Sequence, residues 1–130
     1  PLLGLGREGF RAERDRLMAS GAWPLVKPFP HLHNDFIDMS VKQGLPAGFI
    51  LLAVLLLPIL VFRRDSRHAD PGVRSLAVAG MLLPVLFIGF GLSEVMLGSK
   101  AGRVIYLGWL PVIYALYRNE LLRFNAAARG

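Results

Sequence analysis

The residues best suited to chemistry in this sequence form one short cluster, His31-Leu32-His33-Asn34-Asp35. An unperturbed imidazole titrates at about pH 6.5, so either histidine can accept a proton at neutral pH. The cluster precedes a long apolar segment by about a dozen residues. A histidine beside a membrane surface is able to deprotonate a sugar hydroxyl as it attacks a lipid-linked donor. The alternative interpretation is that both are exposed loop histidines next to a helix cap.

Metal binding is the weaker use of these side chains. His31 and His33 are separated by one residue, and no third ligand stands at a spacing typical of a zinc site. The sequence contains no cysteine, which excludes thiolate nucleophiles and cysteine-ligated metals. Asp35 and Asp38 form an acid pair, but a place in the first turns of a helix explains both through the helix dipole. We predict no metal and no cofactor.

A second cluster, in the segment 6–20, is rich in arginine. Its basic residues are Arg7, Arg11, Arg14 and Arg16, and its acidic residues are Glu8, Glu13 and Asp15. The planar fork of arginine suits pyrophosphate, so Arg7 and Arg11, together with Asp35, are candidate substrate-binding residues. The alternative is a solvated helix face balanced by intrahelical pairs such as Arg11 with Asp15.

The glycines before this segment match a dinucleotide-binding pattern only formally. Gly4-Leu5-Gly6-Arg7-Glu8-Gly9 has the spacing GxGxxG, but no strand precedes it and no βαβ unit surrounds it. We expect a tight turn that leads into the arginine-rich helix.

The elements that must position these clusters are predicted to be helices in a membrane. The sequence is 54% hydrophobic and 18% charged, whereas soluble domains have about 45–50% apolar and about 25% charged residues. Leu45–Phe62 contains eighteen residues without a charge and would extend about 27 Å as a helix, close to the hydrocarbon thickness of a bilayer. The predicted fold class is an all-α transmembrane bundle, with spans at 46–62, 75–97 and 104–117.

The loops predict the orientation of the bundle. Four arginines lie in the loop 63–74 and three in the tail 118–130, so both should be cytoplasmic by the positive-inside rule. The segment 1–45 and the turn 98–103 then face the periplasm. Arginine-flanked spans favour phosphate-rich membrane partners, and we predict no nucleic-acid partner.

Local signals predict two short helices in the segment 1–45. The first covers residues 6–20, with Gly21 as its stop, and the second begins after the cap residue Asn34 and ends near Gln43. Three prolines, Pro24, Pro28 and Pro30, predict an extended connector between them. Each span also contains a proline, Pro58, Pro84 or Pro111, which requires neighbours that satisfy the freed carbonyls. Glu94, at the end of the second predicted span, is a further functional suspect.

With these segments placed, the sequence resembles the superfamily of O-antigen ligases and O-antigen polymerases. The resemblance lies in HLHNDFIDMSVKQGLPAGFILLAVLLLPILVFRR, where a His-Asn pair, an amphipathic helix and a glycine turn (residues 44–48) precede a long span. PLLGLGREGF and GLSEVML resemble the stretch before this signature and the penultimate span of the family. Among family members the O-antigen ligase of lipopolysaccharide biosynthesis is the expected match.

The resemblance implies a bacterial inner-membrane protein of about a dozen helices, of which this chain is the C-terminal part. Such proteins transfer a glycan from undecaprenyl pyrophosphate to lipid A–core on the periplasmic side. The implied reaction is metal-independent, inverting and free of nucleotide. His33 takes the place of the family's essential histidine, with His31 and Asn34 supporting it, and the essential arginines lie mostly upstream of Pro1.

Other functions stay open at this point. A glycan polymerase or a protein O-oligosaccharyltransferase would use the same site with another acceptor. A transporter or structural membrane subunit would carry the histidines incidentally, and a lipid-binding accessory would hold the donor without chemistry. We expect membrane lipid and the missing N-terminal transmembrane part to complete the protein, because the chain begins at Pro1 and three spans alone make a poor bundle.

Overall fold

The computed structural model describes residues 2–22 and 30–129. These residues form five α-helices, in the order α1 (Gly6–Ala19), α2 (Asp35–Gln43), α3 (Leu45–Arg63), α4 (Pro71–Gly91) and α5 (Lys100–Ala127). The described ranges contain no strand, so the predicted all-α class is confirmed. Pro24 and Pro28 of the expected connector lie outside the described residues.

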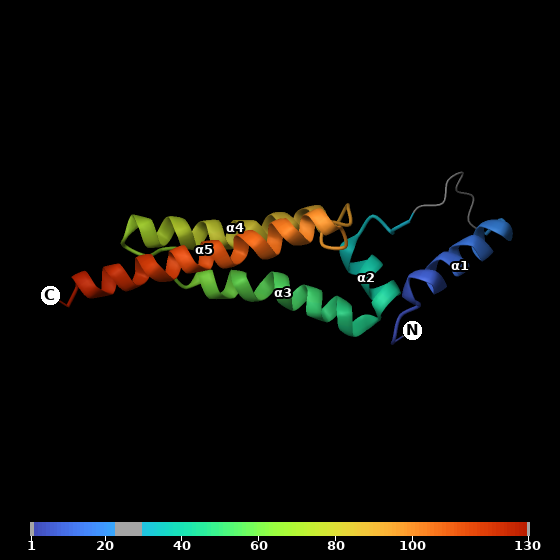
Figure 1. The fold of residues 1–130 in the computed structure, drawn as a ribbon, viewed down its shortest axis with the longest axis horizontal. Coiled ribbons are helices and arrows are strands. Elements are labelled where there is room, and N and C mark those ends of the chain that lie inside the picture. The colour runs from blue at the N-terminus through green and yellow to red at the C-terminus, as the bar shows by residue number, and fades with distance from the viewer. Residues whose placement is uncertain (1, 23–29, 130) are drawn as a thin grey trace.

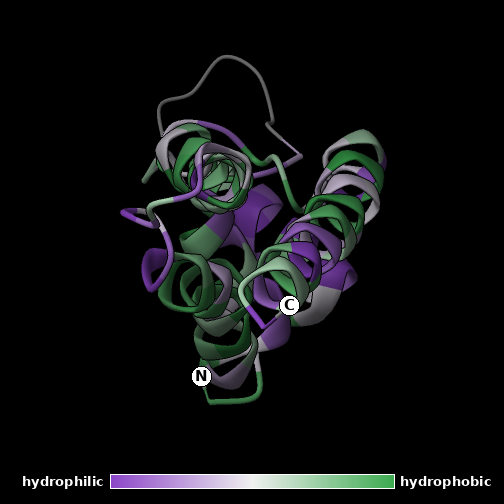
Figure 2. Cartoon of the chain, turned by 90° about the vertical axis from the view of Figure 1, so that its left-hand side faces the viewer, coloured by the Kyte–Doolittle hydropathy of each residue, from purple (hydrophilic) through white to green (hydrophobic). Residues whose placement is uncertain are grey.

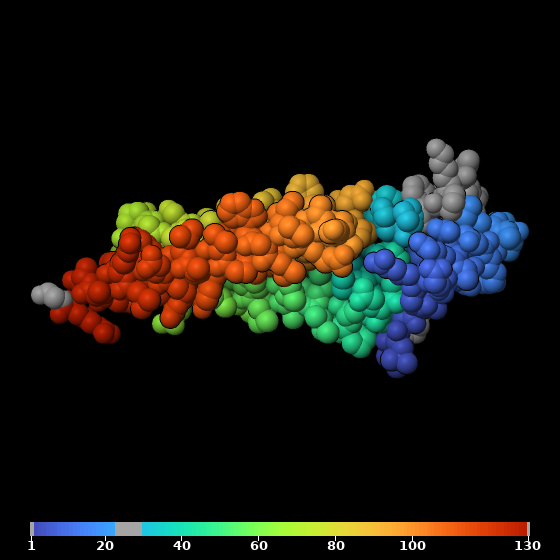
Figure 3. Space-filling model, in the orientation of Figure 1, coloured from blue at the N-terminus to red at the C-terminus, as the bar shows by residue number. Residues whose placement is uncertain are grey.

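The three long helices lie side by side in an elongated bundle, with α3 packed on α4 and α4 on α5 (Figure 1). The short helices α2 and α1 extend it at one end, as the space-filling view also shows (Figure 3). We call this the histidine end; its loops are residues 30–34 and 92–99. The opposite end, with the loop 64–70 and the C-terminal turns of α5 (118–127), is the arginine end.

Local caps explain the two short helices. The Asn34 side chain accepts a hydrogen bond from the Ile37 backbone N–H (3.0 Å), which satisfies one of the donors left at the start of α2. Helix α1 ends where Gly21 adopts a φ of +70°, a conformation that glycine enters without a Cβ penalty. The predicted boundaries of both helices are therefore confirmed to within one residue.

A tight corner joins α2 to α3 and fixes the N-terminal segment. Gly44 has a φ of +93°, and a Cβ there would lie 2.4 Å from the Leu2 carbonyl oxygen. The first turn of α3 approaches α2 so closely that a Cβ on Gly48 would lie 2.3 Å from Ser40 Oγ. The glycine turn quoted in the sequence analysis thus lets α2 pack closely against the start of α3.

The core of the bundle also explains how α3 tolerates its proline. Pro58 cannot donate the hydrogen bond that a helix would send to the carbonyl four residues earlier, at Val54. The hydroxyl of Tyr106 in α5, which is fully buried, donates to this Val54 oxygen at 2.8 Å. The prediction that a neighbouring helix satisfies the freed carbonyl is confirmed at this position.

Two helices, α3 and α4, are long and apolar enough to cross a membrane. In their most apolar stretches, 17% and 28% of the residues are buried within the chain, whereas a core helix of a soluble protein is mostly buried. Figure 2 views the bundle from the arginine end and shows green, hydrophobic turns among white and purple ones on its helices. Two of the three predicted spans correspond to these helices; α5 is less apolar and falls outside this set.

The helix boundaries of α4 and α5 differ from the predicted spans. The side chain of Asp70 caps α4 by accepting a hydrogen bond from the Val73 N–H (2.8 Å), so the helix begins at Pro71 instead of residue 75. It ends at Gly91 instead of residue 97. Helix α5 covers twenty-eight residues, against the predicted 104–117, because Ser99 caps it and no strong helix breaker follows Pro111. Hydropathy located the apolar stretches, whereas the caps set the helix ends: α4 begins earlier and ends earlier than predicted, and α5 extends beyond both predicted limits.

Candidate functional site

The histidine end brings together two polar side chains that are far apart in the sequence. His33 Nδ1 lies 3.1 Å from Glu94 Oε1, and the two side chains are 43% and 55% exposed. Glu94 follows α4 in a loop, so it is not inside the helix where the predicted span 75–97 placed it. The hydrogen bond from His33 is the main cause that lowers the pKa of Glu94 below its ordinary value.

Two anchors, the residues directly after His33, hold this pair in place. Asn34 Nδ2 donates to the Leu92 carbonyl oxygen (3.0 Å). Asp35, which is 2% exposed, accepts from the backbone N–H groups of Met96 (2.9 Å), Leu97 (2.8 Å) and Gly98 (2.9 Å). The start of α2 is thereby fastened to the loop 92–99, and Glu94 lies between the two fastened points of that loop.

The backbone at His33 is itself unusual. His33 has a φ of +51°, and no other non-glycine residue in the described part of the chain has a positive φ. Holding a non-glycine residue in this left-handed conformation costs about 1–3 kcal/mol, and such a residue persists where the surrounding contacts leave it no alternative. The conformation turns the ring of His33 against that of His31, with ring centroids 4.3 Å apart in an edge-to-face arrangement.

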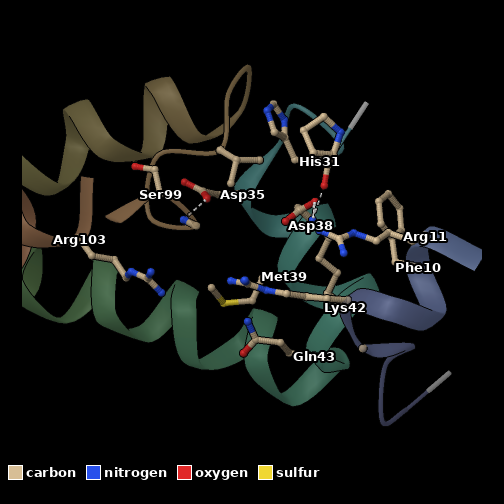
Figure 4. Close-up of a pocket in the computed structure, with 15 residues that line it drawn as sticks. Phe10, Arg11, His31, Asp35, Asp38, Met39, Lys42, Gln43, Ser99 and Arg103 are labelled. Carbon is tan, nitrogen blue, oxygen red and sulfur yellow. Dashed lines mark hydrogen bonds and ion pairs between the residues drawn. The ribbon is translucent and has the colours of Figure 1, made fainter. Parts of the chain in front are cut away.

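A cavity of about 490 Å³ lies beside this histidine pair, and His31 lines it (Figure 4). Four cationic side chains contribute to its wall, from α1, α2 and α5: Arg7, Arg11, Lys42 and Arg103. Figure 4 shows Arg103 on one side of Met39 and Arg11 on the other, so the positive charges surround the cavity from different elements. An oxyanion such as a phosphate is the ligand that this lining favours.

The charges in the wall are only partly neutralised. Lys42 Nζ lies 2.6 Å from Asp38 Oδ1, donates to the Pro30 carbonyl (3.0 Å) and sits 4.8 Å from the centroid of the Phe10 ring. Arg11 contacts Glu8 at 2.9 Å, not Asp15 as the sequence analysis considered. The four cationic side chains of the wall outnumber its two carboxylates, Asp35 and Asp38.

The predicted site residues therefore separate into groups with different surroundings. His31, His33 and Asn34 lie together at the histidine end, and Arg7 and Arg11 line the adjoining cavity with Asp35. Asp35, predicted as a substrate contact or a helix-dipole residue, has both oxygens engaged by the loop 96–98. These hydrogen bonds join the start of α2 to the loop 96–98, and Asp35 also lines the cavity.

Sequence reasoning identified only part of the site. Glu94 was a suspect without a partner, and Arg103 was not selected, because both reach the site only through the packing of α4 and α5 against the rest. Lys42 had a local signal, since it follows Asp38 by four residues on α2.

The comparisons with known proteins give one distant relative. Over 107 residues, 82% of this chain, the sequence is 24% identical to an uncharacterized protein of Haemophilus influenzae. The aligned region is 27% of that protein, so the chain spans about a quarter of the relative's length. No family model matches the chain, and no solved structure matches it.

Proposed function

We propose that this chain is part of a membrane glycosyltransferase that moves a glycan from undecaprenyl pyrophosphate to lipid A–core, as an O-antigen ligase does. The observation that carries the proposal is the His33–Glu94 pair, fixed by Asn34 and Asp35 beside a cavity lined by four cations. A base next to an oxyanion site is the pairing that transfer from a pyrophosphate donor requires.

In the proposed reaction, an acceptor hydroxyl attacks the anomeric carbon of the donor sugar. The new C–O bond forms as the bond from that carbon to the pyrophosphate oxygen breaks, and the electron pair leaves with undecaprenyl pyrophosphate. His33 takes the hydroxyl proton. Glu94 accepts from Nδ1 of His33, which selects the tautomer whose Nε2 lone pair receives that proton, and it stabilises the imidazolium that results.

The cationic cavity supplies the other half of the chemistry. Pyrophosphate is a good leaving group, so its departure needs positive charge more than a general acid. Arg7 and Arg11 approach the cavity from α1, and Arg103 approaches it from α5. Binding of the donor there would place its sugar near His31 and His33.

The membrane setting of this proposal follows from the exposed apolar faces of α3 and α4. We place the bundle in a bacterial inner membrane, with α5 as a third crossing covered by further helices, and with the histidine end in the periplasm. The arginine end would then face the cytoplasm, since Arg63, Arg64, Arg67 and Arg74 gather around its loop.

The test is transfer in vitro by the purified full-length protein, with undecaprenyl-pyrophosphate glycan and lipid A–core, in EDTA and without nucleotide. We expect His33→Ala to lose at least about 100-fold in rate, the usual contribution of a general base. His68→Ala is the matched control, because His68 lies at the arginine end, and it should keep the wild-type rate. Equal transfer by His33→Ala would contradict the proposal and favour a transporter or structural subunit.

A second arm tests the cavity. Arg103→Ala should raise the KM for the donor about tenfold or more, the cost of one charge-assisted hydrogen bond. Arg123→Ala, on the same helix at the arginine end, should leave it unchanged. Product with a glycan or protein acceptor but none with lipid A–core would replace the ligase assignment with a polymerase or a protein-glycosylating relative.

A further inference from the structure

The histidine end contains a second arrangement that the proposed transfer reaction does not use. His31, His33 and Glu94 each offer one donor atom, and these three atoms lie within 4.8 Å of one another. Sequence reasoning set metal binding aside because the two histidines had no third ligand at a suitable spacing. The fold supplies that ligand from the loop after α4, sixty-one residues from His33.

The geometry of the three donors is close to that of a zinc site. Ligands at about 2.0–2.1 Å from a tetrahedral zinc ion lie about 3.3 Å from each other. His33 Nδ1 and Glu94 Oε1 are already 3.1 Å apart, and a contraction of about 1.5 Å would close the widest separation. The exposed sides of His33 and Glu94 leave room for a water molecule as the fourth ligand.

A second observation concerns His31. Its Nδ1 atom is buried and has no hydrogen-bond partner, and it is the one such side-chain atom found among the described residues. A buried polar atom without a partner costs about 1–3 kcal/mol. A small shift of the ring to ligate a metal ion would change the surroundings of this nitrogen.

We infer that His31, His33 and Glu94 form a binding site for a divalent transition-metal ion of the zinc type. Two imidazoles and a carboxylate favour zinc, nickel or copper over magnesium and calcium, which prefer all-oxygen ligands. The ion would occupy a lone pair of His33. A consequence, which rests on the proposed function, is that the bound ion inhibits glycan transfer by removing the base.

The experiment measures metal binding by the full-length protein after EDTA treatment and removal of the chelator. Zn²⁺ is titrated against a chromogenic zinc chelator, and Co²⁺ is added separately so that its visible absorption reports the ligand set. We expect His31→Ala and the nearly isosteric Glu94→Gln each to weaken zinc binding at least about tenfold. Removing a group that only hydrogen-bonds to a metal ligand already costs about that much, so removing a ligand should cost no less. His68→Ala, the third histidine of the chain, is the control that should bind like wild type, and excess Mg²⁺ should not compete.

Equal zinc affinity in wild type, His31→Ala and Glu94→Gln would overturn the inference, and so would competition by Mg²⁺. The transfer assay separates this result from the fate of the proposed function. Zinc binding without any transfer would leave the metal site standing and refute the transferase. Transfer by wild type that stoichiometric Zn²⁺ does not slow, with no zinc bound, would refute the metal site and leave the transferase standing.

Discussion

The two ends of the bundle use the same residue types in different ways. At the arginine end, His68 Nδ1 accepts from the Asp70 N–H (3.1 Å) and its ring packs on Phe124, so its surroundings are those of a loop histidine. At the histidine end, His33 has a strained backbone and a carboxylate partner sixty-one residues away. His33 combines a strained backbone with a carboxylate partner from a distant loop, a combination that His68 lacks, and this indicates where the fold has been shaped for more than stability.

The aspartates differ in the same sense. Asp70 caps its own helix through one hydrogen bond to Val73. Asp35 lies just after a helix cap but accepts three hydrogen bonds from a distant loop. A local cap can be replaced by water, whereas a buried carboxylate shared by three N–H groups cannot, because all three donors lose their partner together.

The largest expected effect comes from Asp35→Ala compared with Asp70→Ala. Asp35→Ala leaves three backbone donors without a partner and should lower the free energy of unfolding by about 3 kcal/mol or more. Asp70→Ala removes one cap and should cost about 1 kcal/mol. Denaturant unfolding of both variants in the same detergent measures the difference. Equal losses would remove the contrast between the two ends.

The next effect concerns two tyrosines of α5. The Tyr106 hydroxyl donates to the carbonyl that Pro58 leaves open, inside the apolar part of the bundle, whereas Tyr117 donates to Asp65 in the loop of the arginine end. Tyr106→Phe should cost about 1–2 kcal/mol because Val54 is left without a donor, and Tyr117→Phe should cost less, since Asp65 is only partly buried.

A second substitution sharpens this test. Pro58→Ala restores an N–H that can bond to Val54 within α3, so the penalty of Tyr106→Phe should shrink in the Pro58→Ala background. Thermal melting of the four proteins of the cycle measures the coupling. Additive changes would show that Tyr106 does not compensate for the proline.

The smallest expected effect is a pH dependence. The pKa of Glu94 is lowered in the folded protein, chiefly by the hydrogen bond from His33. The contact therefore stabilises the fold above the ordinary carboxyl pKa of about 4.3, and this contribution is lost as pH falls through the lowered value. The difference in Tm between wild type and Glu94→Gln should be present at about pH 6 and should vanish at pH values below the lowered pKa of Glu94. A difference that grows toward acid would contradict this sign.

Much of the local structure could be predicted from the sequence. Asn34 as a cap, Gly21 as a stop and the uncharged run before Arg63 are signals that act within one turn or one helix, and each appears as expected. The start of α4 was missed although Asp70-Pro71 is itself a cap signal, because hydropathy was given more weight than capping.

The rest of the site depended on contacts that no local pattern contains. Glu94 meets His33, and the loop 96–98 meets Asp35, only after α3 and α4 have crossed the bundle and returned. The same return brings Arg103 to a cavity that α1 and α2 line. The histidine cluster could be selected from residue type and position, whereas its partners required the fold.

The central claim is that His33 and Glu94 act as one unit, and a double-mutant cycle on the transfer rate tests it most directly. We predict that His33→Ala alone loses at least about 100-fold, that Glu94→Gln alone loses about tenfold, and that the double variant is no slower than His33→Ala, because a positioning residue has no effect once the base is gone. Losses that multiply in the double variant, or a Glu94→Gln enzyme that transfers glycan at the wild-type rate, would contradict the account.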